Sequence, residues 1–332
     1  MPREIRLAAR PVGLPQPQVF ALTETAMPAP RDGEVLVRNL YMSVDPYMRG
    51  RMNDVKSYTP PFALGEPLEG GAVGRVEQSR HPQFTVGDCV SSNLGWREVF
   101  VSDGSNLGRL DAEAAPLTAY LGALGGTGLT AYVGLLDIGK PKPGETVFVS
   151  AAAGAVGSLV GQIAKLHGCR VVGSAGSPAK VAFLLNELGF DAAIDYHREN
   201  LAEALAGHCP DGIDVYFDNV GGDHLQAALA LMNPFGRIPA CGMISQYNNT
   251  TPAPGPNNLT QIVRARLTVQ GFIISDHLDR RPAFLKDMSA WLRAGTVKGH
   301  ETIVSGIEQA PAALVGLLQG ENIGKMLVKL SD

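Results

Sequence analysis

Val147–Gly157 carries the residue spacing best suited to chemistry. A short apolar run, Val-Phe-Val, predicts a strand, and Ala152-x-Gly154-x-x-Gly157 then leads into a predicted helix. Gly154 has no Cβ, so the chain can turn tightly and a pyrophosphate can approach the backbone, while Gly157 lets helix and strand pack closely. Free N–H groups at a helix start attract an anion. The spacing therefore predicts a dinucleotide site at Gly154, Ala155, Val156 and Gly157. Ala152 replaces the usual first glycine, and the alternative is a glycine turn that binds nothing.

The residues after the next predicted strand indicate which dinucleotide would bind. An NAD protein usually has Asp or Glu about 20 residues after the turn, to hold the adenosine ribose. Here Gly173–Lys180 reads Gly-Ser-Ala-Gly-Ser-Pro-Ala-Lys, without an acid. No carboxylate would repel a 2′-phosphate, Ser174 and Ser177 can donate hydrogen bonds, and Lys180 can supply a charge. The segment favours NADP(H) over NAD, although Lys180 alone could be a solvated lysine.

A series of strands and helices after Pro116 would position these residues. Strands are expected at Thr146–Ser150 and Arg170–Ser174, and a third strand is expected to end at Asp195-Tyr196. Three more are expected at Ile213–Phe217, Arg237–Cys241 and Leu267–Phe272. Helices are expected at Ala155–His167, after Ser177-Pro178 up to Gly189, after Gly221-Gly222, and at Pro282–Leu292. Six β-units with helical crossovers predict a doubly wound parallel sheet, the Rossmann arrangement.

The first third of the chain has a different pattern. Short strands are expected at Val35–Leu40, Gly70–Val76, Cys89-Val90 and Trp96–Val101, with little helical periodicity, which predicts a barrel-like all-β unit. The tail, Thr302–Val304 and Lys325–Leu330 around an apolar helix, does not extend the Rossmann series. A chain of 332 residues is also long for one core, so at least two domains are expected. The fold class is α/β.

Composition excludes several classes of function. The net charge is −4, and no basic run interleaves with aromatic residues, so nucleic-acid binding is not expected. Glycines interrupt both long uncharged stretches, residues 114–136 and 146–164, so no membrane segment is expected. The four cysteines lie far apart without a C-x-x-C, which favours buried free thiols in the cytoplasm over a disulfide framework or a structural zinc site.

Several segments together resemble a known family. They are Ser43–Gly50 (Ser-Val-Asp-Pro-Tyr-Met-Arg-Gly), Gly128–Tyr132, Ala151–Lys165, Asp218–Gly222, Cys241–Asn248 and Asn322–Lys325. In this combination the chain resembles the zinc-free medium-chain dehydrogenase/reductases, in the branch of leukotriene/prostaglandin reductases and plant alkenal double-bond reductases. The resemblance runs from near residue 40 to the C-terminus.

The resemblance implies an architecture and an activity. A GroES-like catalytic domain would occupy residues 1–120, an NADP-binding Rossmann domain residues 121–296, and residues 297–332 would return to the catalytic domain. The implied activity is saturation of the C=C bond of an α,β-unsaturated aldehyde or ketone. A homodimer joined through the Rossmann sheets is implied as well.

The zinc-dependent relatives of this family have metal ligands that this sequence lacks. They place a Cys in the segment occupied here by Met42–Asp45 and a His before the residue resembling Glu69, where Leu68 stands. A catalytic zinc needs three protein ligands, and the seven histidines show no matching pattern. No metal site is expected.

Without a metal, the polarised enone itself would have to accept the hydride. Hydride delivered to the β-carbon leaves an enolate, whose oxygen needs a donor and whose α-carbon needs a proton. By the resemblance, Tyr247 is the leading candidate for this donor and Tyr47 the second. A phenol with a pKa of about 10 stays protonated at neutral pH. The alternatives are packing over the cofactor for Tyr247 and packing under the substrate for Tyr47.

Further cofactor contacts are expected around the sheet. Asn219 ends the fourth predicted strand, at the carboxyl edge where open sheets bind ligands. The resemblance adds Tyr196 at the adenosine phosphate end and Asn322 from the tail, each with an ordinary turn or packing role as the alternative. On the nicotinamide side it adds Cys241, Gly242, Ser245, Tyr247, Phe272, Ile273 and Ile274.

Two other functions fit the same residues. A quinone reductase of the same superfamily would share the cofactor site and differ in the acceptor. A non-catalytic NADPH-binding protein would bind the cofactor without consuming it. Tyr247 and Tyr47 favour an enzyme over the second alternative.

Overall fold

The computed structural model describes residues 1–331, which form two compact units. One unit comprises Met1–Leu121 together with the tail from Glu301, and the other comprises Gly122–His300. The first is therefore built from two separate stretches of chain, and the second from one continuous stretch. Each unit has its own sheet.

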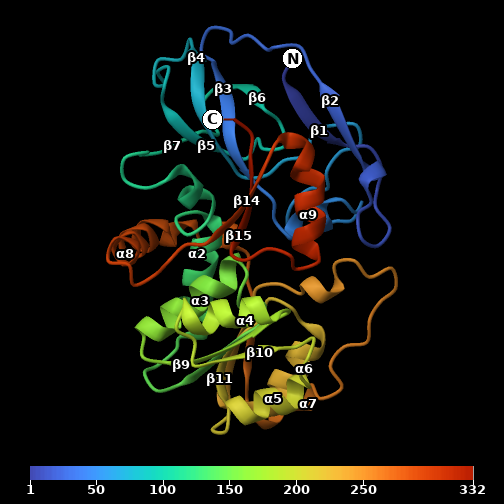
Figure 1. Cartoon of the computed structure of the whole chain (residues 1–332), viewed down its shortest axis with the longest axis vertical. Helices are drawn as coiled ribbons and strands as arrows, with labels where there is room; N and C mark the ends of the chain where they lie inside the picture. The colour runs from blue at the N-terminus through green and yellow to red at the C-terminus, as the bar shows by residue number, and fades with distance from the viewer. Residues whose placement is uncertain (332) are drawn as a thin grey trace. The chain divides into compact units, whose positions relative to one another are not determined.

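A seven-stranded mixed sheet forms the framework of the first unit (Figure 1). Its order is β14-β15-β3-β4-β5-β7, and β6 pairs with β3. All pairs are antiparallel except β14 with β15. The strands are β3 (Val35–Ser43), β4 (Ala72–Ser79), β5 (Cys89–Ser92), β6 (Val99–Ser102), β7 (Gly108–Arg109), β14 (Glu301–Ser305) and β15 (Lys325–Lys329). The tail thus completes this sheet.

Helices and a two-stranded ribbon surround this sheet. The ribbon joins β1 (Arg3–Leu7) to β2 (Phe20–Glu24), and a short helix, α1 (Tyr47–Arg51), follows β3. Both were absent from the sequence prediction, because five-residue elements carry little periodicity. The tail helix α9 (Ala310–Leu318) buries Ala313 and Leu314 in a core shared with α1 and Trp96. The minor turns are η1 (Pro17–Val19), η2 (Leu117–Leu121) and η6 (Ile307–Gln309).

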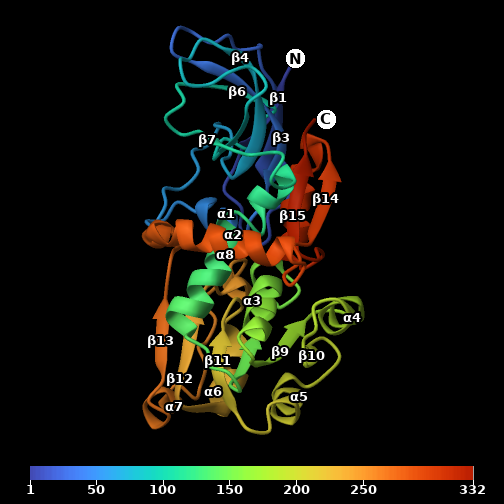
Figure 2. The same ribbon diagram turned by 90° about the vertical axis from the view of Figure 1, so that its left-hand side faces the viewer.

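Six parallel strands form the sheet of the second unit, in the order β10-β9-β8-β11-β12-β13 (Figure 2). They are β8 (Thr146–Val149), β9 (Arg170–Ala175), β10 (Ala192–Asp195), β11 (Ile213–Phe217), β12 (Met232–Ala240) and β13 (Thr268–Gly271). In chain order the strands read 3-2-1-4-5-6, which is the Rossmann order. The structure confirms the predicted doubly wound parallel sheet.

Two helices of this unit begin at a capping side chain. Ser177 accepts a hydrogen bond from the Lys180 N–H at the start of α4 (Pro178–Asn186), and Asn200 caps α5 (Leu201–His208). A Ser or Asn in this position satisfies N–H groups that have no partner within the helix. The other α-helices are α2 (Gly126–Tyr132), α3 (Ala155–Leu166), α6 (Gly222–Leu231), α7 (Thr260–Arg264) and α8 (Arg281–Arg293). The unit also contains two 3-10 helices, η4 (Ile244–Gln246) and η5 (Ile274–Arg280).

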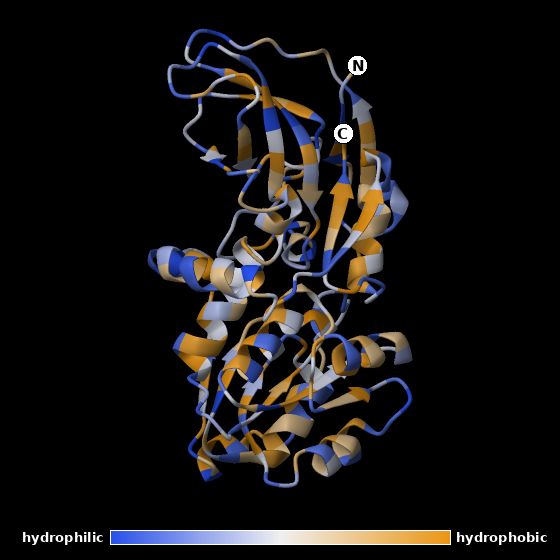
Figure 3. Ribbon diagram, turned by 60° about the vertical axis from the view of Figure 1, so that its left-hand side comes forward, coloured by the Kyte–Doolittle hydropathy of each residue, from blue (hydrophilic) through white to orange (hydrophobic). Residues whose placement is uncertain are grey.

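Burial varies strongly across this sheet. Every residue of the central strand β8 is buried, and so are four of the five in β11. Such strands read as continuous apolar runs because helices cover both faces of the sheet. Figure 3 shows central strands coloured mainly as hydrophobic. The edge strand β13 differs, since all four of its residues are exposed.

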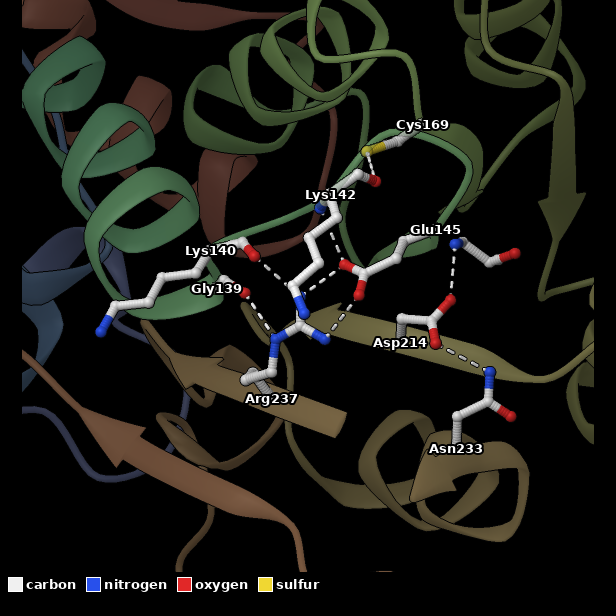
Figure 4. Close-up of polar contacts among 9 residues, drawn as sticks. Gly139, Lys140, Lys142, Glu145, Cys169, Asp214, Asn233 and Arg237 are labelled. Atoms are coloured by element: carbon white, nitrogen blue, oxygen red, sulfur yellow. Dashed lines mark hydrogen bonds and ion pairs between the residues drawn. The ribbon is translucent and has the colours of Figure 1, made fainter. Parts of the chain in front are cut away.

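Arg237 stabilises the amino edge of this sheet, the side at which its parallel strands begin. A π-helix, η3 (Val133–Gly139), ends there, and the Arg237 guanidinium donates to the carbonyls of Gly139 and Lys140 and to the Glu145 carboxylate (Figure 4). Helix ends leave carbonyls that need donors, and Arg237 provides them here. The strand β12 begins at Met232, earlier than predicted, with an irregular stretch before Arg237.

No helix of the described residues is long and apolar enough to cross a membrane.

Candidate functional site: the carboxyl edge of the parallel sheet

The candidate site lies where the strand order of the parallel sheet reverses. Crossovers lead away from β8 in one direction, through β9 to β10, and from β11 in the other, through β12 to β13. Open parallel sheets bind ligands outside the carboxyl ends of strands at such a point. The loops that follow β8, β9, β10, β11 and β12 contain most of the predicted cofactor residues.

The turn from β8 into α3 is compact. Gly154 caps the helix with an extended backbone and is half-buried, as are Ala155 and Val156. Gly157 is buried, and a Cβ on it would lie 2.5 Å from the Ala151 carbonyl oxygen. Glycine at this position therefore permits the close helix packing expected of a phosphate-binding turn.

The end of β9 places Ser177 and Lys180 on the next helix. Ser177 is half-buried and its hydroxyl caps α4. Lys180 is also half-buried, and burial lowers the pKa of its ammonium. Ser174 lies deeper: it is fully buried, and its carbonyl accepts from the Ala152 N–H. The main chain of Ser174, rather than its hydroxyl, therefore holds the glycine turn.

Tyr196 follows β10 and lies against the β9–α4 loop. A Cβ on Gly176 would be only 2.9 Å from the Tyr196 hydroxyl, so the phenol rests on that glycine. Tyr196 as a whole residue is 36% exposed, and partial burial raises the pKa of its hydroxyl. The β10 end thus brings a protonated phenol next to the turn that carries Ser177.

A buried network joins the ends of β8 and β11. The Tyr216 hydroxyl donates to the Asp218 carboxylate at 2.7 Å, and the Asn219 side-chain amide donates to the Ser150 carbonyl at 2.8 Å. The Asn219 N–H donates to the Ser150 hydroxyl. Burial raises the pKa of Asp218, while donors including the Gly221 N–H oppose the rise. Asn219 is consequently fixed at the switch point.

The loop after β12 is tied to the loop after β11. The N–H groups of Cys241 and Gly242 both donate to the Asp218 carbonyl, and the Ser245 hydroxyl donates to the Val220 carbonyl at 2.6 Å. The Tyr247 oxygen accepts from the Met243 N–H at 3.4 Å. Asn219, Cys241, Gly242, Ser245 and Tyr247 are therefore neighbours on one double loop.

The predicted Phe272–Ile274 segment follows β13. The Phe272 ring lies edge-on to Phe217 with 6.4 Å between ring centroids, and a Cβ on Gly134 would meet it. Ile273 and Ile274 are half-buried at the start of η5. Phe272 thus packs partly against the end of β11.

Tyr47 and Asn322 belong to the first unit. Tyr47 begins α1 and is 36% exposed, and burial and then the Asp45 carboxylate raise the pKa of its hydroxyl well above the usual value. Asp45 pairs with the buried Lys325 ammonium at 3.1 Å. Asn322 is buried, and its amide donates to the Gly324 carbonyl, so it stabilises the turn before β15.

Two arginines next to Tyr47 have structural partners. Arg49 is only 3% exposed and donates to the Gly13 carbonyl and Asn53. The Arg51 guanidinium pairs with Glu69 at 2.9 Å and lies over the Phe62 ring. The contacts of Arg49 and Arg51 hold loops of the first unit.

Sequence reasoning missed several residues that build this edge. Ser150, Tyr216 and Asp218 organise Asn219, and His224 packs on Tyr196. The Asp-Asn-Val-Gly-Gly segment contained a signal, because a carboxylate next to a glycine turn can accept its N–H groups. The contacts of Tyr216 and His224 join distant parts of the chain, and no local pattern reveals them.

Two family models match the chain. The one described as the N-terminal domain of oxidoreductase matches residues 3–110, and the one described as a zinc-binding dehydrogenase matches residues 155–291. The second description mentions zinc, and a catalytic zinc takes three protein ligands. Among the residues the structure describes, no group of three or more His, Cys, Asp or Glu side chains could hold a metal ion. These side chains do not fit a zinc site.

Relatives match over nearly the whole chain. The putative NADP-dependent oxidoreductase YfmJ of Bacillus subtilis (strain 168) is 51% identical, covering 99% of this chain and 98% of the relative. The NADPH-dependent curcumin reductase of Escherichia coli (strain K12) is 45% identical, with coverages of 98% and 96%. The crystal structure of CurA in complex with NADPH from Vibrio vulnificus has a TM-score of 0.96 and 47% identity, covering 99% of each chain. The chain belongs to the medium-chain dehydrogenase/reductase family, in the branch of the alkenal, prostaglandin and curcumin reductases, as the sequence resemblance predicted.

Proposed function

We propose that the protein is an NADPH-dependent reductase of the C=C bond in α,β-unsaturated aldehydes or ketones. The main observation that supports this proposal is the glycine turn at the switch point of the sheet, next to the end of β9, where no carboxylate follows the strand. Three relatives are named for reduction of 2-alkenals, prostaglandins and curcumin, which supports this substrate class.

The cofactor would lie along the carboxyl edge of the sheet. Gly154–Gly157 would hold the pyrophosphate through backbone N–H groups. Ser177, Lys180 and Tyr196 would hold the 2′-phosphate. Asn219, the 241–247 loop and Phe272–Ile274 would face the nicotinamide ribose and ring. Asn322 is a further candidate cofactor contact by the family resemblance. Ser174 would act through the turn it supports.

Bound NADPH would supply a hydride to the β-carbon of the enone. The protein's part would be to stabilise the charge that develops on the carbonyl oxygen and to return a proton to the α-carbon. Tyr247 would donate to that oxygen, since the Met243 N–H orients its phenol. Tyr47 would be a second donor, and its raised pKa keeps its proton in place.

A substrate panel tests the reaction. We expect NADPH consumption with enals and enones, and Tyr247→Phe should lower kcat by about a hundredfold, the usual effect of losing one donor to an oxyanion. Tyr120→Phe is the matched control, because that phenol donates only to the backbone of Asp111 among the contacts described. Faster turnover of quinones would favour a quinone reductase, and cofactor binding without consumption of NADPH would favour a non-catalytic protein.

Calorimetry tests the cofactor. We expect NADPH to bind at least tenfold more tightly than NADH, because one charge-assisted contact to the 2′-phosphate contributes about 1.5–3 kcal/mol. Equal affinities would contradict the assignment of the 2′-phosphate site.

A homodimer in the cytoplasm is part of the same proposal. The exposed edge strand β13 carries unpaired backbone groups, which can pair with a second copy. The cysteines are free, which is typical of a reducing compartment. Sedimentation should give a dimer for the wild type and a monomer for Gln270→Pro in β13.

A further inference from the structure

Two histidine rings contact the ring of Tyr196. The His224 ring lies edge-on at 4.9 Å between centroids, with an interplanar angle of 82°. The His197 ring lies at 4.5 Å and 66°. His197 is exposed and its Nδ1 lies 2.9 Å from the Gly176 carbonyl oxygen, whereas His224 comes from a distant helix, α6. Tyr196 is therefore held by elements that follow two different strands.

His224 is the buried member of this group. Its residue is 6% exposed, and its Nε2 atom has no hydrogen-bond partner among the described residues. Burial lowers the pKa of the imidazole to about 4. The ring is thus neutral at physiological pH, and its contact with Tyr196 is one of packing.

The position of the Tyr196 ring decides where its hydroxyl lies. That hydroxyl rests on Gly176, directly before the Ser177 cap and the first turn of α4 with Lys180. An aromatic ring held edge-on by a buried ring has few other orientations. Loss of the His224 ring would let Tyr196 rotate away from this loop.

We propose that His224 is a positioning residue for the 2′-phosphate pocket, since its ring fixes Tyr196 so that the phenol hydroxyl stays beside Gly176 and the Ser177–Lys180 turn. This inference rests on the proposed function, and it adds a residue of α6 to the determinants of cofactor choice. His224 itself does not touch the cofactor.

Calorimetry with two cofactor fragments tests the proposal. ADP-ribose and 2′-phospho-ADP-ribose differ only in the phosphate, so their affinity ratio isolates the pocket. We expect His224→Ala to weaken 2′-phospho-ADP-ribose about tenfold, the effect of one misplaced hydrogen bond to a charged group, with ADP-ribose changed less than about twofold. His224→Phe keeps a ring at the same place and should retain the wild-type ratio.

A Tyr196→Phe background supplies the second arm. If His224 acts through the phenol, His224→Ala should add less than about twofold to the loss that Tyr196→Phe causes alone. The proposal is overturned if His224→Ala leaves the ratio unchanged, weakens both fragments equally, or adds its full effect in the Tyr196→Phe background. A His224→Phe variant as weak as His224→Ala would also overturn it, because the nitrogen rather than the ring would then matter.

The same data separate this inference from the proposed function. A wild-type protein that binds both fragments equally has no 2′-phosphate pocket, and both proposals fail. A wild type that prefers the phosphorylated fragment, together with an indifferent His224→Ala, removes only His224.

Discussion

Asp218 shows how one buried residue can organise two loops. Its side chain accepts from the N–H groups of Val220 and Gly221, and its main-chain carbonyl accepts from those of Cys241 and Gly242. An unsatisfied buried backbone donor costs about 1–3 kcal/mol, so the two loops have a strong reason to keep this arrangement. These hydrogen bonds hold together the two loops of the proposed nicotinamide side.

His224 gives a prediction about acid stability. Its pKa is about 4 in the folded protein, because burial disfavours the charged ring, and about 6.5 in an unfolded chain. Between these pH values the unfolded chain binds more protons, so the free energy of unfolding falls as the pH drops from about 6.5 to 4. The whole effect is at most about 3 kcal/mol.

We expect His224→Phe to remove this part of the pH dependence. Urea unfolding at pH 7.5 and pH 4.5 should show a smaller loss of stability for the variant than for the wild type. Equal losses of stability in the two proteins would show that the folded state does not lower the pKa of His224.

Residue roles divided clearly between those that sequence could reveal and those it could not. The positions of Gly154 in a turn and of Asn219 after a strand end were predictable, because such places recur in a doubly wound sheet. The burial of Ser174 and Arg49 was not, since both residues have polar side chains that usually stay near the surface. Their burial depends on neighbours that are distant in the sequence.

At the scale of elements, the β8–α3 turn allows a comparison of two glycines. A Cβ on Gly157 would meet the backbone at 2.5 Å, whereas a Cβ on Gly154 would lie 3.2 Å from the nearest atom. Gly157→Ala should therefore force the helix away from the strand, cost about 1–3 kcal/mol of stability and weaken NADPH binding by tenfold or more. Gly154→Ala should have a much smaller effect on stability, as measured by thermal unfolding and calorimetry. Equal stability of the two variants would contradict the packing role of Gly157.

We expect replacement of Arg237 at the amino edge of the sheet to lower the free energy of unfolding. Its guanidinium joins the end of η3 to Glu145, with both side chains 17% exposed. Arg237→Met leaves the Glu145 carboxylate and two carbonyls without this donor, and should cost about 3 kcal/mol of unfolding free energy. The NADPH affinity should stay within twofold, because cofactor residues lie at the carboxyl edge. A large drop in affinity at unchanged stability would contradict this separation of roles.

Element prediction succeeded where turns bound an apolar run and failed where the local pattern is ambiguous. The strands β8 and β11 and helix α3 formed nearly as expected, because apolar runs bounded by turns specify them locally. The π-helix η3 carries no periodicity that distinguishes it from an α-helix. The early start of β12 includes Pro234 and Gly236, residues that read as a turn.

At the scale of the molecule, the raised pKa values of three cysteine thiols predict that the protein reacts slowly with electrophiles. Burial raises the pKa of Cys169 to about 11 and those of Cys209 and Cys241 to about 12. At pH 8 a thiol of pKa 12 is a thiolate in about one molecule in ten thousand, and the thiolate is the nucleophile. This matters because the proposed substrates alkylate thiolates.

We therefore expect slow labelling of these three cysteines by N-ethylmaleimide at pH 8. Peptide mapping should find Cys89 in β5 labelled first, ahead of Cys241, which is also half-buried but has a thiol with a raised pKa. Labelling should accelerate about tenfold per pH unit for Cys241, since the thiolate fraction rises in that proportion below the pKa. Rapid labelling of Cys241 at neutral pH would contradict its raised pKa.

The sheet of the first unit takes β14 and β15 from the last thirty or so residues of the chain, and β15 pairs with β3. On the ribosome, Gly122–His300 can complete its own sheet while the earlier residues still wait for their final strands. We therefore expect the unit Gly122–His300 to fold before the unit that contains both ends of the chain. A released chain truncated after His300 should keep the middle unit resistant to protease and leave residues 1–121 open to cleavage.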